Sequence, residues 1–133
     1  MTRIADAFAR AGRKGRATFV AYLTAGDPSP DDTVALAGAL ARAGADVLEL
    51  GVPFSDPIAD GPVLQRAAAR ALEAGTTLSC VFEIARRVRA ETELALVLFS
   101  YLNPLLRRGL AGMAGEAREA GFDGVLLTDL PPE

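Results

Sequence analysis

Three carboxylates lie close together around one short passage of the chain, where their types and spacing could serve acid–base chemistry. Glu49 sits in an apolar run, Asp56 and Asp60 follow in a loop rich in proline and glycine, and Pro62 opens a helical pattern. Proline is favoured at the first helical position because the N–H that it lacks would have no partner there. The passage therefore predicts strand, tight loop and helix. Glu49 is placed at the carboxyl end of the strand, the edge where parallel α/β folds carry their active sites.

The surroundings of the acids decide which chemistry each can perform. Side chains alternate along a strand, so Glu49 is expected to share one face with Val47. Leu48 and Leu50 then face the other way, toward helices. A carboxylic acid among apolar groups has a raised pKa, which suits it to proton transfer near neutral pH. Asp60 lies on a polar loop and should therefore ionise more readily than Glu49. The alternative for Glu49 is a structural ion pair with an arginine or lysine.

The elements that must position these acids alternate regularly between strand and helix. β-Favouring apolar runs predict four strands, and turn residues with helical spacing predict the helices between them. The strands are expected at 17–23, 46–50, 94–100 and 124–128, and the helices at 1–16, from 30 to a stop at Gly44, at 62–74, from a cap at Thr77, and at 109–120.

Apolar residues at helical spacing predict which side of each helix is buried. The expected inward faces are Ile4, Phe8 and Ala11; Leu36, Leu40 and Ala43; Leu78, Phe82, Ala85 and Val88; and Leu110, Met113 and Ala117.

Regular alternation of strand and helix favours a parallel sheet, and an internal repeat supports it. Residues 43–46 before the second strand echo residues 120–123 before the fourth, each combining a helix end, a turn and a strand start. A flavodoxin-like open sheet would show the same alternation and is the alternative fold. Against it, the turn at 26–28 after the first strand lacks the spacing of a glycine-rich phosphate loop.

Composition narrows the functional classes. The chain has 133 residues, half of them hydrophobic, with a net charge of −3 and no long basic run, so neither nucleic acid nor an anionic membrane is an expected partner. The single Cys80 cannot form an internal disulfide, which predicts a reducing, cytoplasmic location. The sequence has no histidine, and one cysteine is too few for a thiolate zinc site. We therefore expect no metal, signal peptide or membrane span.

Four passages of the sequence resemble those of a known family. Residues 48–57 followed by 59–62 resemble the signature of the tryptophan synthase alpha chain. Residues 24–28 resemble the family's first strand–loop junction, and 100–104 and 128–131 resemble later junctions in the same order. The resemblance implies a (β/α)₈ TIM barrel, which usually needs roughly 250 residues. We therefore expect residues 1–133 to form a single domain of about four β/α units, the N-terminal half of such a barrel, truncated relative to the family.

The resemblance also implies a reaction. Alpha chains of this family cleave indole-3-glycerol phosphate to indole and glyceraldehyde 3-phosphate, a retro-aldol step of tryptophan biosynthesis catalysed by a lyase. On this analogy Glu49 is the general acid–base at the indole ring carbon and at the side-chain hydroxyl. Asp60 holds the indole N–H and stabilises the positive charge that develops on the ring.

The same resemblance implies substrate-binding positions. Tyr22, Phe99 and Leu126 match positions that wall the indole, and Tyr101 matches a position near the loop acid. For Phe99 and Leu126 the alternative is ordinary barrel packing. Tyr22 carries a hydroxyl where many relatives have a plain ring.

Partners and cofactors follow from the resemblance as well. The family implies an alpha2-beta2 heterotetramer with a tryptophan synthase beta chain, with pyridoxal phosphate on the beta chain and no cofactor in this chain. The loops that hold the substrate phosphate in the family are not encoded here, so the chain is expected to be weak or inactive alone. The alternative is a catalytically inactive fragment acting only as a folding unit or a beta-chain binding partner. Open sheet edges also predict self-association of the half barrel.

Overall fold

The computed structural model describes residues 1–132, which form four strands and six helices. In chain order the elements are α1 (Arg3–Arg13), β1 (Val20–Thr24), α2 (Pro30–Arg42), β2 (Val47–Gly51), α3 (Pro62–Glu73), α4 (Leu78–Glu91), β3 (Ala95–Ser100), α5 (Leu102–Arg108), α6 (Leu110–Glu119) and β4 (Gly124–Leu127).

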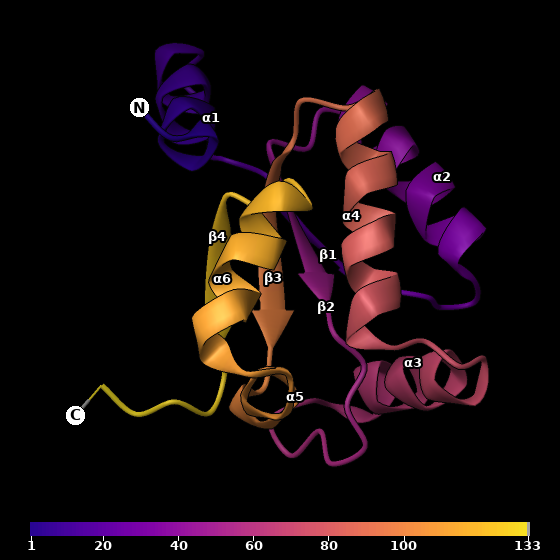
Figure 1. Cartoon of the computed structure of the whole chain (residues 1–133). Helices are drawn as coiled ribbons and strands as arrows, with labels where there is room; N and C mark the ends of the chain where they lie inside the picture. The colour runs from indigo at the N-terminus through magenta and orange to yellow at the C-terminus, as the bar shows by residue number, and fades with distance from the viewer. Residues whose placement is uncertain (133) are drawn as a thin grey trace.

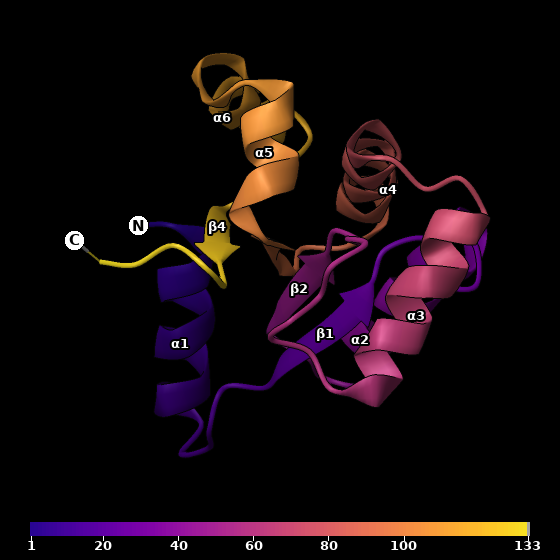
Figure 2. The same ribbon diagram turned by 90° about the horizontal axis from the view of Figure 1, so that it is seen from below.

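The sheet is parallel throughout, with the strands in the order β1-β2-β3-β4. Figures 1 and 2 show helices α2 to α6 on one side of the sheet and α1 on the other. Successive β/α units that always step in the same direction, with their helices on one side, build a barrel wall. A flavodoxin-like sheet reverses its strand order and carries helices on both faces. The half barrel is therefore confirmed, and the flavodoxin-like alternative is wrong.

The two faces of the sheet are covered by different helices. Leu48 and Leu50 of β2 are fully buried in the core beneath the outer helices. Val47 points to the opposite, inner face, where it packs with Ala95 and with Ala7 of α1. The predicted alternation along β2 is confirmed. The inner face is covered by α1 at its amino end and stays open toward its carboxyl end.

Helix α1 contacts the sheet along a stripe of small residues. Thr2 caps it by accepting a hydrogen bond from the Ala5 N–H at 3.2 Å. Ala7 and Ala11 are fully buried, whereas Phe8 is 52% exposed. The prediction that Phe8 faces inward is wrong, because the close approach that α1 makes through its alanines leaves no room for an aromatic ring.

Three further sequence-based expectations about the helices are wrong. Helix α2 buries Val34, Ala37 and Gly38 against its neighbours, so Leu36 lies on its outer side, 44% exposed. Ala43 is also exposed, because α2 ends before it. On α6, Leu110 occupies the first turn and is 47% exposed. Leu36 and Leu110 have the right spacing but lie on helix faces that no other element of residues 1–132 covers.

Two boundaries also differ from those predicted. Strand β1 begins at Val20 and not at residue 17, because the strand that pairs with it begins at Val47. Helix α5 lies where the sequence patterns indicate only a strand–loop junction. Pro104 lies in the first turn of α5, where its missing N–H breaks no intrahelical hydrogen bond.

The internal repeat forms two equivalent clamps at the amino ends of the strands. Asp46 accepts a hydrogen bond from the Phe19 N–H at 2.8 Å and is paired with Arg16. Asp123 accepts from the Leu96 N–H at 2.9 Å and is paired with Arg89. In each case the aspartate N–H also donates back to the same residue's carbonyl. The repeat therefore sets the register of β1 with β2 and of β3 with β4.

Within residues 1–132, none of the helices combines the length and the apolar character that crossing a bilayer would require.

Candidate active site

Glu49 lies in the middle of the inner face, on β2. It is paired in register with Tyr22 on β1 and with Val97 on β3. Its side chain is half-buried, and this burial raises the pKa of Glu49 above that of a free glutamate. No arginine or lysine of residues 1–132 forms an ion pair with it, so the structural ion-pair alternative finds no support there. Glu49 is an acid held partly out of water without a neutralising partner.

Asp60 lies at the end of the β2–α3 loop, directly before α3. The Asp60 N–H donates to the Pro57 carbonyl at 3.0 Å, and the side-chain amide of Gln65 donates to the Asp60 carbonyl at 2.8 Å. The preceding N–H, of Ala59, donates to the Tyr101 hydroxyl at 2.9 Å. Burial raises the pKa of Tyr101, and the nearby Asp60 carboxylate raises it further. The loop acid and Tyr101 are therefore neighbours, held by backbone hydrogen bonds on both sides of Asp60.

The Tyr22 side chain lies across the inner face from β1 toward β3. A Cβ placed on Gly51 would come within 2.0 Å of the Tyr22 hydroxyl oxygen. The ring meets Phe99 edge to face, with the ring centroids 5.2 Å apart. Only glycine at position 51 leaves room for this arrangement. Tyr22 and Phe99 thus form a continuous aromatic surface on the same face of the sheet as Glu49.

Leu126 continues this surface onto β4. It is paired in register with Phe99 and is 39% exposed on the open part of the inner face. The structure therefore places Tyr22, Glu49, Phe99 and Leu126 on one face of the sheet, with Asp60 and Tyr101 at its carboxyl rim. The roles assigned to these residues from the sequence stay predictions.

Three residues at this edge were not singled out from the sequence. Gly51 supports the Tyr22 ring, Phe54 packs against Tyr101 with centroids 5.2 Å apart, and Asp129 accepts from the Leu102 N–H at 2.7 Å. Strand alternation could have indicated Gly51, because it lies two positions after Glu49 on the same face. No local pattern marks the other two, whose partners are distant in the sequence.

An ion pair holds the first loop of the sheet against the helix that follows Asp60. Arg70 on α3 donates two hydrogen bonds of 2.8 Å to the two carboxylate oxygens of Asp27. Such a bidentate pair restricts orientation as well as distance. It ties the β1–α2 loop to α3, and so fixes the end of the loop that carries Asp60.

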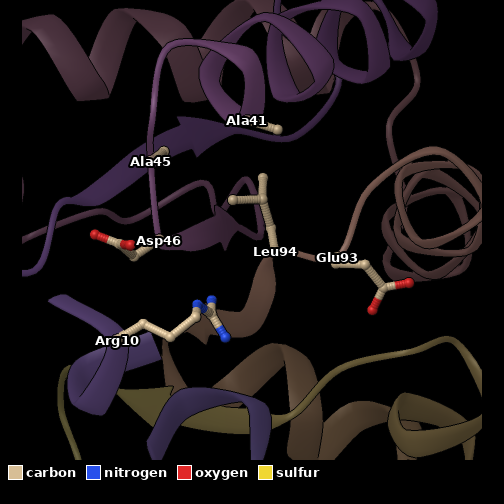
Figure 3. A pocket seen from close by; sticks show the side chains of 6 residues that line it. All are labelled: Arg10, Ala41, Ala45, Asp46, Glu93 and Leu94. Carbon is tan, nitrogen blue, oxygen red and sulfur yellow. The ribbon is translucent and has the colours of Figure 1, made fainter. Parts of the chain in front are cut away.

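A separate hollow of about 190 Å³ lies at the amino edge of the sheet, away from these acids (Figure 3). It is lined by Arg10, Ala41, Ala45, Asp46, Glu93 and Leu94. Asp46 is the clamp residue already engaged by Arg16 and Phe19. The hollow therefore belongs to the structural end of the sheet. Within residues 1–132 no group of three or more cysteine, aspartate or glutamate side chains is arranged to hold a metal ion.

The fold and the placement of the acids define a β/α-barrel protein whose candidate site lies at the carboxyl ends of its strands. The family model described as tryptophan synthase alpha chain matches residues 8–133. The chain belongs to this family, as the resemblance predicted.

Individual relatives agree with this assignment. The tryptophan synthase alpha chain of Solibacter usitatus is 59% identical over 133 residues, which is all of this chain and 50% of that protein. The alpha chain of Geobacter sulfurreducens is 52% identical, again over all of this chain and 50% of its own length. The chain thus spans about half the length of the curated relatives it matches.

Solved structures give the same result. Tryptophan synthase subunit alpha from Legionella pneumophila superimposes with a TM-score of 0.95 at 45% identity, covering 99% of this chain and 51% of that one. Tryptophan synthase from M. tuberculosis, in its aminoacrylate-bound form, superimposes with a TM-score of 0.94 at 32% identity, covering 99% and 54%.

Proposed function

We propose that this chain carries the acid–base part of a lyase site that cleaves indole-3-glycerol phosphate to indole and glyceraldehyde 3-phosphate. The observation that carries the proposal is Glu49, a half-buried acid without an ion-pair partner in residues 1–132, facing the same open surface as the aromatic rings. Its raised pKa favours the protonated acid, which is the form needed to deliver a proton.

The proposed reaction begins at the indole ring. Asp60 accepts a hydrogen bond from the ring N–H, and protonated Glu49 donates its proton to the ring carbon that bears the side chain. The ring becomes a cationic indolenine, whose charge is stabilised by the Asp60 carboxylate. A fixed anion at the place where positive charge develops lowers the energy of the transition state more than that of the bound substrate.

Cleavage of the carbon–carbon bond completes the proposed reaction. The ionised Glu49 takes the proton from the hydroxyl on the first side-chain carbon, and that carbon becomes the aldehyde of glyceraldehyde 3-phosphate. The electron pair of the breaking bond returns to the ring, which neutralises the indolenine and releases indole. Glu49 ends protonated, as it began, so the cycle consumes no other reactant.

The neighbouring residues support this assignment. Tyr22, Phe99 and Leu126 offer an apolar surface for the flat indole, and the ring contact between Tyr22 and Phe99 holds that surface in place. Tyr101 holds the backbone next to Asp60. The steps above use no cofactor, and we assign pyridoxal phosphate to a partner beta chain and a cytoplasmic location to the protein.

A second function, docking to a tryptophan synthase beta chain, is favoured by the exposed side of the β2–α3 loop. Ile58 in this loop is 84% exposed, and a hollow of about 330 Å³ lies between the loop and α3, beside Phe54 and Leu72. Apolar residues exposed beside a hollow are typical of protein interaction sites.

One experiment separates the two functions. Indole release from indole-3-glycerol phosphate is measured for the chain alone and with a beta chain, and binding of the beta chain is measured in parallel. Indole release that is lost in Glu49→Gln supports the lyase. Binding to the beta chain with indole release no higher than the Glu49→Gln background assigns the docking function alone.

A further inference from the structure

The Tyr22 hydroxyl occupies a specific place in the site. It stands where a side chain of residue 51 would begin, since a Cβ there would meet the hydroxyl oxygen at 2.0 Å and the ring carbon bearing it at 2.5 Å. Residue 51 follows Glu49 by two positions on the same face of β2, a step of about 6.6 Å along a strand. The hydroxyl therefore lies one step beyond Glu49, toward the loop that carries Asp60.

The hydroxyl is available to a ligand. Its ring is fixed by Phe99 on one side and by the Gly51 backbone beneath it. Burial raises the pKa of Tyr22, a hydrogen bond with the Thr24 side chain partly offsets this, and the charges of Asp60 and Glu49 raise the pKa further. The tyrosine oxygen accepts the hydrogen bond with Thr24, since that bond lowers the pKa, so the O–H itself is left to donate elsewhere. The group is therefore a neutral O–H donor on a fixed ring, close enough to Asp60 and Glu49 for their charges to act on it.

The neighbouring acids determine what this donor can serve. Under the proposed function Asp60 receives the ring N–H, and a ring N–H cannot accept a hydrogen bond from a hydroxyl. Glu49 works at the ring carbon that carries the side chain and at the first side-chain hydroxyl. The substrate atoms left to accept a hydrogen bond from the Tyr22 hydroxyl are thus the side-chain oxygens.

We propose that Tyr22 is a specificity-determining residue whose hydroxyl donates a hydrogen bond to a hydroxyl oxygen of the substrate's polyol side chain. The inference rests on the proposed function and goes beyond the packing role expected for this position, because the ring alone would recognise only the indole. Tyr22 selects 3-substituted indoles with an oxygenated side chain over those with a plain alkyl chain.

The composition of the chain makes the test direct. The sequence has no tryptophan, so the added probe is the only source of indole fluorescence in the sample. Two probes are titrated by fluorescence: indole-3-glycerol phosphate and the same molecule without side-chain hydroxyls. All proteins carry Glu49→Gln so that the substrate is not consumed, and Tyr22→Phe is compared with the parent. Circular dichroism checks that each variant is folded.

The expected result is selective. Tyr22→Phe should weaken binding of indole-3-glycerol phosphate by about three- to tenfold, the range of one neutral hydrogen bond, and leave the dehydroxylated probe within about twofold. Tyr101→Phe is the matched control, because its hydroxyl accepts from the Ala59 N–H. It should not discriminate between the probes.

Two results overturn the inference. Equal weakening of both probes by Tyr22→Phe would assign Tyr22 to packing, and no weakening of either would show that its hydroxyl is not used. Failure of the proposed function looks different. In that case the parent protein binds neither probe, and the role of Tyr22 falls with it.

Discussion

The Arg16 guanidinium forms a two-pronged ion pair with Asp46, at N–O distances of 2.7 and 2.8 Å. The Phe19 N–H donates to the same carboxylate. These hydrogen bonds, led by those from Arg16, hold the pKa of Asp46 well below its usual range. The pair lies at the opposite edge of the sheet from Glu49, so its contribution is to stability.

The stability of the fold should therefore depend on Asp46 in acid. Its folded pKa is lowered, so its contribution is present above the unfolded pKa of about 4 and is lost as the pH falls toward the folded pKa. Asp46→Ala should cost about 1–3 kcal/mol at neutral pH and less at low pH. Urea unfolding at both pH values measures this. Glu83→Gln, at an exposed surface pair, is the control and should change little.

Glu49→Gln should lower the rate of indole formation by about 10²- to 10⁴-fold, because glutamine keeps the shape of the side chain but transfers no proton. The rate is measured with the beta chain present. An activity above about a tenth of the parent's would contradict the acid–base role.

The same substitution should raise stability at neutral pH. Burial raises the folded pKa of Glu49, so ionising it costs free energy as the pH rises through its titration range. Glutamine avoids that cost, and the difference should vanish at a pH where glutamic acid is neutral in both states. A variant less stable than its parent at neutral pH would show that the ionised carboxylate is instead stabilised in the fold.

Asp60→Asn should reduce turnover much more than substrate affinity. Asparagine keeps a hydrogen-bond acceptor for the indole N–H but lacks the charge that stabilises the indolenine. Steady-state kinetics separate the two effects. An unchanged kcat with a raised KM would make Asp60 a binding residue only.

Gly51→Ala should displace the Tyr22 ring and destabilise the fold by about 1–3 kcal/mol, the usual cost of overpacking. The added methyl group would lie 2.0 Å from the Tyr22 hydroxyl. Gly115→Ala on α6 is the opposite control: its Cβ meets nothing within 4 Å, and alanine favours a helix. Thermal unfolding should give shifts of opposite sign, and equal shifts would argue against the Tyr22–Gly51 contact.

Self-association of the 133-residue chain also stays a prediction. Strands β1 and β4 each pair on one side only within residues 1–132, and Val20, Val125 and Leu126 are each more than a third exposed. Unpaired edges beside apolar surface favour pairing with a second copy. Light scattering should show a mass above that of a monomer, increasing with concentration. A monomeric mass at every concentration would contradict it.

Much of this fold could be predicted because its signals are local. The alternation along β2 placed Leu48 and Leu50 under the helices, and Thr77 capped its helix as expected. The failures involve partners distant in the sequence. Phe8 and Leu36 have helical spacing, yet which helix face is covered depends on where another element packs.

In the candidate site, too, features with local sequence signals could be predicted, and contacts between distant segments could not. Glu49 could be placed on the inner face from the alternation of its own strand, but β2 runs on to Gly51, so Glu49 lies in the middle of the strand and not at its carboxyl end as the sequence predicts. The contact of Tyr22 with Gly51 and Phe99 joins three strands, and the hydrogen bond from Ala59 to Tyr101 joins two distant loops. Such contacts depend on register, which no single stretch of sequence contains.

The two aspartate clamps bear on where the sheet opens first. Asp46 locks β1 to β2 and Asp123 locks β3 to β4. Within residues 1–132 the β2–β3 junction has backbone hydrogen bonds at its two ends, from Ala95 to the Asp46 carbonyl at 3.3 Å and from Val52 to the Phe99 carbonyl at 2.9 Å, and no carboxylate of this kind. Each of these two strand pairs thus carries its own register lock, whereas β2 and β3 are joined by the backbone hydrogen bonds of their parallel register, Val47 to Gly51 against Ala95 to Phe99. Because the two locks act on separate strand pairs, we expect removal of either aspartate to increase native-state hydrogen exchange first in its own pair.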